Sequence, residues 1–303
     1  MNDIDNISYN FSESNVFWLN VAISFIMFGV ALGLTISDFK RVFTQPKQIF
    51  AGLFSQLICL PLLTLVLIHI FRPIPSVALG MILVSVCPGG NISNFMSSLA
   101  KANVALSVSL TIVTSSLSII TTPIGLAFYG SLYEPSRMLL REVSLSIPEV
   151  FTTIFFIILL PMMVGMLVRH FASSIADKLE YILKQLSMLI FLVIVVLGIF
   201  TNLDSFLSYI PVVLGLVVIH NLVAFSAGYL IAKFFSLDDK STKTLTIETG
   251  IQNSGLGIAL IFTFFSGLGG MLLVAAAWGV FHIISGLSIA HFFSRKKVSL
   301  LAP

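Results

Sequence analysis

The chain has 303 residues, of which 57% are hydrophobic and only 10% are charged, and its mean hydropathy is +1.05. Soluble domains carry about 25% charged residues, so this composition excludes a soluble protein and predicts one that lies in a lipid bilayer. The net charge of +3 is small and does not indicate nucleic-acid binding. We expect lipid as the surrounding partner and no obligate protein partner.

Nine segments are apolar enough to cross the membrane as helices. A hydrocarbon core of about 30 Å requires roughly 20 apolar residues per helix. The segments lie at about 16–37, 48–71, 75–99, 103–129, 148–168, 186–201, 208–232, 245–265 and 269–294. The loops between them are short and leave no room for a second, soluble domain. The sequence therefore predicts an all-α, nine-span membrane domain over residues 16–295, between a tail at 1–15 and a tail at 296–303.

The basic residues predict the orientation of these spans. If the tail at 1–15 lies outside, only Arg72, Arg137 and Arg141 of the 16 Lys and Arg residues fall on the outer side. This split follows the positive-inside rule. The tail itself has no basic residue and so does not resemble a signal peptide. We expect a protein of the plasma (cell or inner) membrane with its N-terminus outside and its C-terminus in the cytoplasm.

The third and eighth spans are interrupted near their middle. The third carries Cys-Pro-Gly-Gly-Asn-Ile-Ser-Asn at 87–94, and the eighth carries Glu-Thr-Gly-Ile-Gln-Asn-Ser-Gly at 248–255. Proline and glycine predict that the helices unwind there. The breaks lie about 15 Å from Lys101 and Lys240, which is half the hydrocarbon thickness. Because these two spans run in opposite directions, they indicate inverted-topology repeats, with the first four spans paired to the last four around an unpaired fifth.

Glu248 is a carboxylate inside one of these interrupted spans. A charge in hydrocarbon is costly and occurs mainly where it binds something. No Lys or Arg lies at the predicted membrane depth, so its counter-charge is a cation or a proton. Close packing of helices through small residues would not require this carboxylate and the amides beside it. Ser107 and Thr111 share one face of the fourth span, although hydroxyls in membrane helices commonly bond to the preceding turn. Carboxylate, amide and hydroxyl oxygens suit a hard cation.

The strings at 87–94 and 248–255 resemble those of the bile acid:sodium symporter family. The likeness runs from about residue 16 to 295, and the chain is similar to the nine-span form of the vertebrate hepatic and ileal carriers. The resemblance implies a panel domain of spans 1, 5 and 6, at about 16–37, 148–168 and 186–201. It implies a core domain of spans 2–4 and 7–9, at about 48–129 and 208–294. In this fold the two broken helices cross in the core, and substrate binds between core and panel.

The resemblance also implies two sodium sites and a substrate site. The residues that match the first sodium site are Ser93, Asn94, Ser107, Thr111 and Glu248. Those that match the second are Gln56, Glu248 and Gln252, with the carbonyls of Thr249 and Ile251. The positions that match substrate contacts are Asn91, Asn253 and His282. Ile283 follows His282 where some bacterial members have asparagine, and His282 fits a packed structural histidine equally well. His220 and Asn221 are interpreted as structural polar contacts.

We therefore expect a secondary active transporter in which sodium drives symport of an organic anion by alternating access. The anion would be a bile acid or a related carboxylate or sulfonate. The alternative is a proton-coupled or exchanging carrier of a small organic acid, such as a pantoate-like or oxo acid, in which Glu248 titrates. An enzyme is disfavoured because the sequence has no HExxH motif and no paired carboxylates, and we assign no catalytic residue. A receptor is disfavoured because no sizeable signalling domain is present.

Overall fold

The computed structural model describes residues 13–33, 44–90, 92–142, 147–183, 186, 193, 203–265 and 267–295. The named elements within these ranges are all helical. In chain order they are α1 (Glu13–Ala31), α3 (Pro46–Phe54), the π-helical turn η2 (Ser55–Cys59), α4 (Leu60–Phe71), α5 (Pro75–Val86), α6 (Ile92–Leu99), α7 (Val104–Ser131), α8 (Glu134–Glu142), α9 (Ile147–Ile154), the π-helical turn η3 (Phe155–Leu159), α10 (Leu160–Phe171), α12 (Leu203–Phe234), α13 (Asp239–Gly250), α14 (Ser254–Phe264) and α15 (Gly269–Arg295).

Several of these helices are long and apolar enough to cross a membrane. Four pass by length and composition, at Pro46–Phe71, Phe151–Phe171, Val213–Phe234 and Gly269–Arg295, and the bent helix α7 makes a fifth. The expectation of an all-helical protein of the membrane is confirmed to this extent. The predicted span at 186–201 lies almost wholly outside the described residues, and the count of nine spans stays a prediction.

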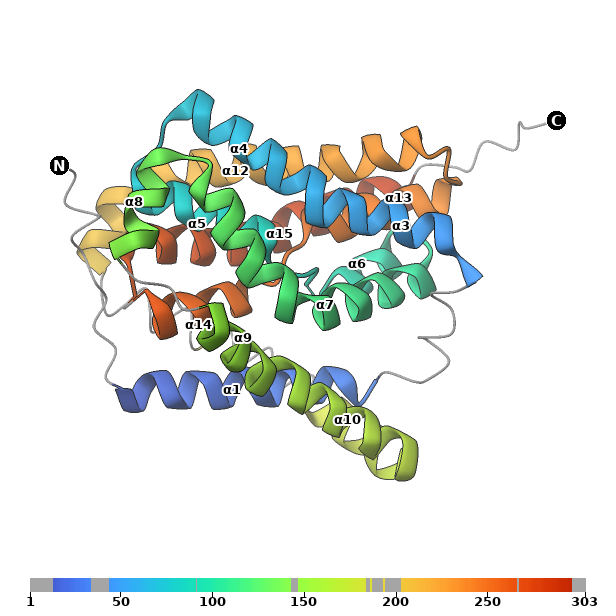
Figure 1. The fold of residues 1–303 in the computed structure, drawn as a ribbon. Coiled ribbons are helices and arrows are strands. Elements are labelled where there is room, and N and C mark those ends of the chain that lie inside the picture. Colours follow the sequence, from blue (N-terminus) through green and yellow to red (C-terminus); the bar gives the residue numbers. More distant parts are fainter. Residues whose placement is uncertain are drawn as a thin grey trace.

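The helices pack in two groups that meet along α14, which contacts α1, and along α7, which contacts α9 and η3. Figure 1 shows α1 along one side of the molecule with α9 and α10 crossing it, while α3–α4, α12 and α15 run beside one another on the other side. α1 packs against α10 and η3 and also touches α14. On the opposite side, α12 packs along α13, and α15 packs along α5. Assignment of these groups to a panel and a core domain stays a prediction.

Two spanning helices contain a π-helical turn directly before a Leu-Pro pair. η2 precedes Pro61 and η3 precedes Pro161. Proline lacks an N–H and crowds the preceding turn, so the regular hydrogen-bond ladder cannot continue through it. The carbonyl of Leu57, four residues before Pro61, instead accepts a hydrogen bond from the Tyr129 hydroxyl at 3.3 Å. The turn η2 places Gln56 in the protein interior.

α7 is bent rather than straight. Its two limbs make an angle of 70° between Ser118 and Ile120, shortly before Pro123. The Thr122 hydroxyl donates to the Val86 carbonyl at 2.9 Å and so ties the bend to the end of α5. The sequence predicts one span at 103–129 without this bend, and it predicts no helix at the position of α8. Pro123, inside this long helix, is the sequence feature that indicates a bend.

α13 is polar in sequence yet buried along residues 241–250. The Asp238 carboxylate caps its first turn and accepts from the Ser241 N–H at 3.0 Å. The Thr244 hydroxyl donates to the Asn103 carbonyl at 3.0 Å. The buried ammonium of Lys243, which precedes the predicted span at 245–265, pairs with Asp239 at 2.7 Å. These polar groups are thus satisfied within the protein, as burial requires.

Candidate ion and substrate site

The two interrupted helices meet inside the molecule. α5 ends at Val86 before α6 begins at Ile92, and α13 ends at Gly250 before α14 begins at Ser254. Gly89 and Gln252, in the unwound segments, form an isolated antiparallel bridge. The Gly90 N–H donates to the Ile251 carbonyl and the Asn253 N–H donates to the Pro88 carbonyl, both at 2.8 Å. Backbone groups released by one break are therefore satisfied by the other.

The Glu248 carboxylate lies beside this crossing and is fully buried. Its Oε1 accepts hydrogen bonds from the hydroxyls of Ser93 on α6 and Ser107 on α7. The Thr111 hydroxyl lies 3.3 Å from Oε1 and 3.2 Å from Oε2, and it lies 3.5 Å from Oδ1 of Asn94. The structure thus brings together all five side chains that the family resemblance implies for a first sodium site.

Two glutamines supply further buried oxygens near the crossing. Neither Oε1 nor Nε2 of Gln56 has a hydrogen-bond partner among the described residues. Gln252 donates from Nε2 to the Thr249 carbonyl at 2.9 Å, while its Oε1 likewise lacks a partner in the described part of the chain. An unsatisfied buried polar group costs about 1–3 kcal/mol. Such amide oxygens are suitable ligands for a hard cation.

The two main-chain ligands predicted for the second ion already accept hydrogen bonds. The Thr249 carbonyl accepts from Gln252, and the Ile251 carbonyl accepts from Gly90. A carbonyl oxygen has two lone pairs, so each retains capacity for a further contact. The Thr249 hydroxyl, which the sequence analysis did not single out, lies 2.8 Å from the Ser55 hydroxyl.

The three predicted substrate contacts are less well defined by the structure. Asn91 lies outside the described residues. The side-chain oxygen of Asn253 caps α14 by accepting from the Leu256 N–H at 3.1 Å. His282 is buried on α15, and its Nδ1 has no partner within the described ranges. No described contact joins these side chains to one another.

Asn221 makes structural polar contacts, as its sequence context predicts, and it makes them beside the site. Its Nδ2 donates to the Gly250 carbonyl at 2.7 Å, and its Oδ1 accepts from the Ser285 hydroxyl at 2.6 Å. It therefore satisfies the last carbonyl of α13 directly beside the crossing. A polar amide in the middle of a span was the available signal, but its partner is visible only once α12 and α13 are packed together.

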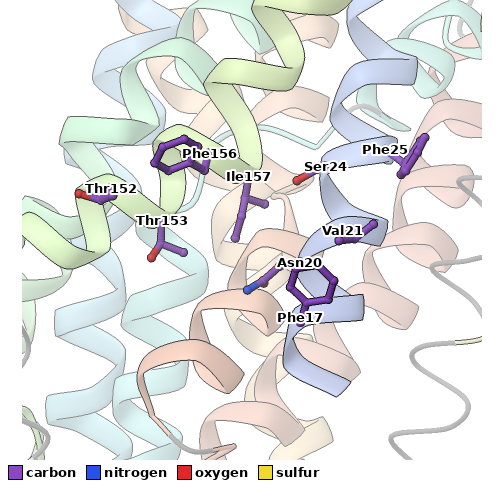
Figure 2. A pocket seen from close by; sticks show the side chains of 9 residues that line it. All are labelled: Phe17, Asn20, Val21, Ser24, Phe25, Thr152, Thr153, Phe156 and Ile157. Atoms are coloured by element: carbon purple, nitrogen blue, oxygen red, sulfur yellow. The ribbon is translucent and has the colours of Figure 1, made fainter. Parts of the chain in front are cut away.

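A pocket lies between α1 and the α9–η3 helix. Its volume is about 390 Å³, and its lining residues are Phe17, Asn20, Val21, Ser24, Phe25, Thr152, Thr153, Phe156 and Ile157. Figure 2 shows Asn20 and Ile157 pointing toward each other across it. Asn20 also reaches α14, because its Nδ2 lies 3.5 Å from the Thr263 hydroxyl. The lining carries no charge, and Phe17, Phe25 and Phe156 are each more than half exposed, so the pocket opens to the surface of the described molecule.

A sequence profile of the Sodium Bile acid symporter family matches residues 20–209. The chain belongs to this family. It is 32% identical over 279 residues to the uncharacterized sodium-dependent transporter YocS of Bacillus subtilis, a match that covers 92% of this chain and 84% of YocS. The family resemblance expected from the two interrupted spans is therefore confirmed.

Plant and animal members of the family match over most of this chain but over less of their own length. The probable sodium/metabolite cotransporter BASS1, chloroplastic, of Arabidopsis thaliana is 28% identical over 244 residues, which are 80% of this chain and 58% of that protein. The sodium/bile acid cotransporter 4 of Mus musculus is 29% identical over 253 residues, which are 82% of this chain and 56% of the mouse protein. These relatives carry transporter names, in agreement with the expectation of a multi-pass membrane transporter rather than an enzyme.

Proposed function

We propose that this protein is a secondary active transporter in which sodium drives the symport of an organic anion by alternating access. The observation that carries the proposal is the buried Glu248 carboxylate, which is surrounded by oxygen atoms and has no Lys or Arg partner among the described residues. A buried charge requires a compensating charge. Sodium is the ion in the names of the relatives described above.

Two sodium ions are proposed to bind at the crossing. The first would take oxygens from Ser93, Asn94, Ser107, Thr111 and Glu248. The second would take Gln56, Gln252 and Glu248 with the carbonyls of Thr249 and Ile251. The fit rests on the chemistry of these donors, because all offer oxygen, and on the amide oxygens of Gln56 and Gln252, which have no other partner in the described part of the chain. Bound ions would hold the unwound segments in one arrangement.

Sodium is favoured over the proton-coupled alternative by the number of oxygens gathered around Glu248. The hydroxyls of Ser93, Ser107 and Thr111 lie against its carboxylate. A proton needs one acceptor, whereas a hard cation takes several oxygen ligands, so this surplus of oxygens supports a metal cation. The names of the relatives, which include sodium, support the same choice.

The anion is proposed to bind where the second halves of the broken helices begin. α6 and α14 present their N-terminal N–H groups and positive dipole ends toward the crossing, which favours a carboxylate or sulfonate. Asn91, Asn253 and His282 would contact it. The description of the matching family, which names bile acid, favours an amphipathic anion of the bile acid type over a small acid. Alternating access would then follow from movement of the predicted panel against the core.

Uptake by the purified protein in proteoliposomes tests this function. We expect an inward sodium gradient to drive accumulation of a bile acid, and choline to give none. With two sodium ions per monovalent anion, an inside-negative potential should add about 2.3 kcal/mol per 100 mV. Accumulation driven by a proton gradient in the absence of sodium would instead establish the proton-coupled alternative. A panel of small hydroxy and oxo acids, offered under the same conditions, would define the substrate.

A further inference from the structure

Gly89 is buried at the crossing, and its own backbone does not explain why it is a glycine. Among the described residues, Gly267 is the one glycine with a positive φ, at 68°. The conformation of Gly89 is therefore open to residues with a side chain. The other use of glycine is to allow a close approach by neighbouring atoms.

The atoms that approach Gly89 are ligands of the proposed ion site. A methyl group on its Cα would lie 3.0 Å from Oε2 of Glu248 and 3.2 Å from Oε1 of Gln56. The next nearest atom is the Thr114 hydroxyl oxygen, at 3.6 Å. Three oxygens from α13, η2 and α7 thus face one side of this residue. The Gln56 oxygen is one of the buried atoms for which the described chain supplies no hydrogen-bond donor.

Gly89 is also held firmly in place. Its N–H donates to the Thr114 hydroxyl at 3.3 Å, and that hydroxyl donates to the Leu110 carbonyl at 2.9 Å. On its other side Gly89 forms the antiparallel bridge with Gln252. Because both contacts fix the backbone, a side chain added here would displace the facing oxygens and not the chain itself.

We propose that the Cα of Gly89 forms a wall of the second sodium site and sets the size of the cation that the site accepts. The inference rests on the proposed function and deepens it. Glu248 Oε2 and Gln56 Oε1 contact the ion, and the bare face of Gly89 provides the room in which they converge. A methyl group at this position narrows the site. A narrower site favours lithium, which is smaller than sodium, and excludes potassium more strongly.

Ion-dependent thermal stabilisation of the full-length purified protein tests this without any transported anion. Unfolding is followed against increasing NaCl, LiCl and KCl, with choline chloride keeping the ionic strength constant. A ligand stabilises the folded state according to its affinity, so each titration gives an apparent Kd. In Gly89→Ala we expect the ratio of the sodium Kd to the lithium Kd to rise several-fold, because the narrower site favours lithium. The matched control is Gly257→Ala, whose new methyl group would meet its nearest atom, Sγ of Cys87, at an ordinary 3.8 Å.

A second variant keeps the proposal testable if Gly89→Ala does not fold. Gln56→Asn withdraws the amide oxygen by one methylene and widens the same site. In this variant the ratio of the sodium Kd to the lithium Kd should therefore fall below the wild-type ratio. Wild-type ratios in the folded variants would overturn the role of Gly89 while leaving the proposed function intact. Absence of any sodium stabilisation in the wild type, relative to choline, would instead overturn the proposed function.

Discussion

At the scale of single residues, Glu248 places an ionisable carboxyl group in a completely buried position. Its immediate neighbours are hydroxyls, which stabilise a carboxylate but do not neutralise it. The nearest described cation along α13, Lys243, is bonded to Asp239. In the proposed sodium sites, the charge of an ionised Glu248 is therefore left for the bound ion to compensate.

The substitution Glu248→Gln should abolish sodium-dependent stabilisation and uptake while leaving expression and helical content unchanged. The amide keeps the size of the side chain and can still accept hydrogen bonds from the serines, but it removes the charge proposed to serve both ions. Thermal unfolding in sodium and in choline measures the effect. Glu149→Gln, the same change at an exposed position on α9, is the control. Sodium stabilisation equal to wild type in Glu248→Gln would contradict the assignment.

The sequence predicts those site residues whose type is unusual in a membrane span. Glu248 and the polar strings beside both breaks stand out because apolar residues surround them, and the family resemblance adds Gln56, Ser107 and Thr111. Asn221 and Thr114 are different. Their contacts with Gly250 and Gly89 depend on how helices distant in sequence are rotated against each other. Glycine beside proline predicts unwinding, but it does not reveal which atoms approach its bare face.

At the scale of elements, the π-helical turn η2 determines where Gln56 lies. A π-helical turn inserts one extra residue into a helix and so rotates the residues before it relative to those after it. Pro61 prevents the regular ladder from closing, and Tyr129 bonds the carbonyl that is left free. The turn therefore couples a feature of helix geometry to the direction of a proposed ion ligand.

Pro61→Ala restores the missing N–H and allows a regular α-helix at this point. We expect the protein to fold with equal or higher thermal stability, because an interior proline costs about 3 kcal/mol in a helix. Rotation of Gln56 should nevertheless raise the apparent Kd for sodium several-fold. Pro161→Ala is the matched control, since it makes the same change after η3 and away from the proposed ligands. Similar sodium Kd values in the two variants would show that η2 does not position the site.

The N-cap of α13 gives a prediction about pH. Burial raises the pKa of Asp238, but hydrogen bonds from the Ser241 hydroxyl and from backbone amides together lower it by more. The pKa of Asp238 therefore lies below the ordinary value. A depressed pKa contributes stability above the unfolded pKa, about 3.9, that is lost as pH falls through the folded value. Asp238→Ala should lower the free energy of unfolding by about 1 kcal/mol at neutral pH. The difference from wild type should shrink in unfolding measurements as the pH falls below 4; a constant difference would contradict the ionised cap.

At the scale of the whole molecule, composition and helix length identify the protein as helical and membrane-embedded, and the structure agrees with both. Most predicted spans lie over described helices with boundaries that differ by a few residues. Hydropathy does not predict the bend of α7 or the early start of α13, because the first follows from one proline and the second from polar residues satisfied inside the protein. The panel and core division depends partly on residues 186–201, which lie mostly outside the described ranges.

The predicted orientation is tested by cysteine labelling from each side of the membrane. In a background without Cys59 and Cys87, a cysteine introduced at Lys101 or Lys178 should react with a membrane-impermeant reagent only from the cytoplasm. One introduced at Met138 on α8 should react only from outside. The opposite pattern would invert the topology derived from the positive-inside rule.

Coupling between ion and anion should follow from the unwound segments that both proposed sites share. Gln252, a proposed sodium ligand, is adjacent to Asn253, a proposed anion contact, and the Asn253 N–H is bonded to the carbonyl of Pro88 in the other segment. Ordering such backbone costs about 1–2 kcal/mol per residue. If sodium has already ordered it, the anion binds more tightly, and by linkage the anion raises sodium affinity by the same factor.

Calorimetric titration of a bile acid into the purified protein measures this coupling. Wild-type affinity should be higher in sodium than in choline. Gln252→Ala removes an ion ligand and leaves the anion's own contacts in place, so it should weaken anion binding at low sodium and recover partly at high sodium. Gln48→Ala, the same change near the start of α3, should behave as wild type. If the wild type binds the anion equally well in sodium and in choline, the two sites are uncoupled, and binding in the shared segments does not account for symport.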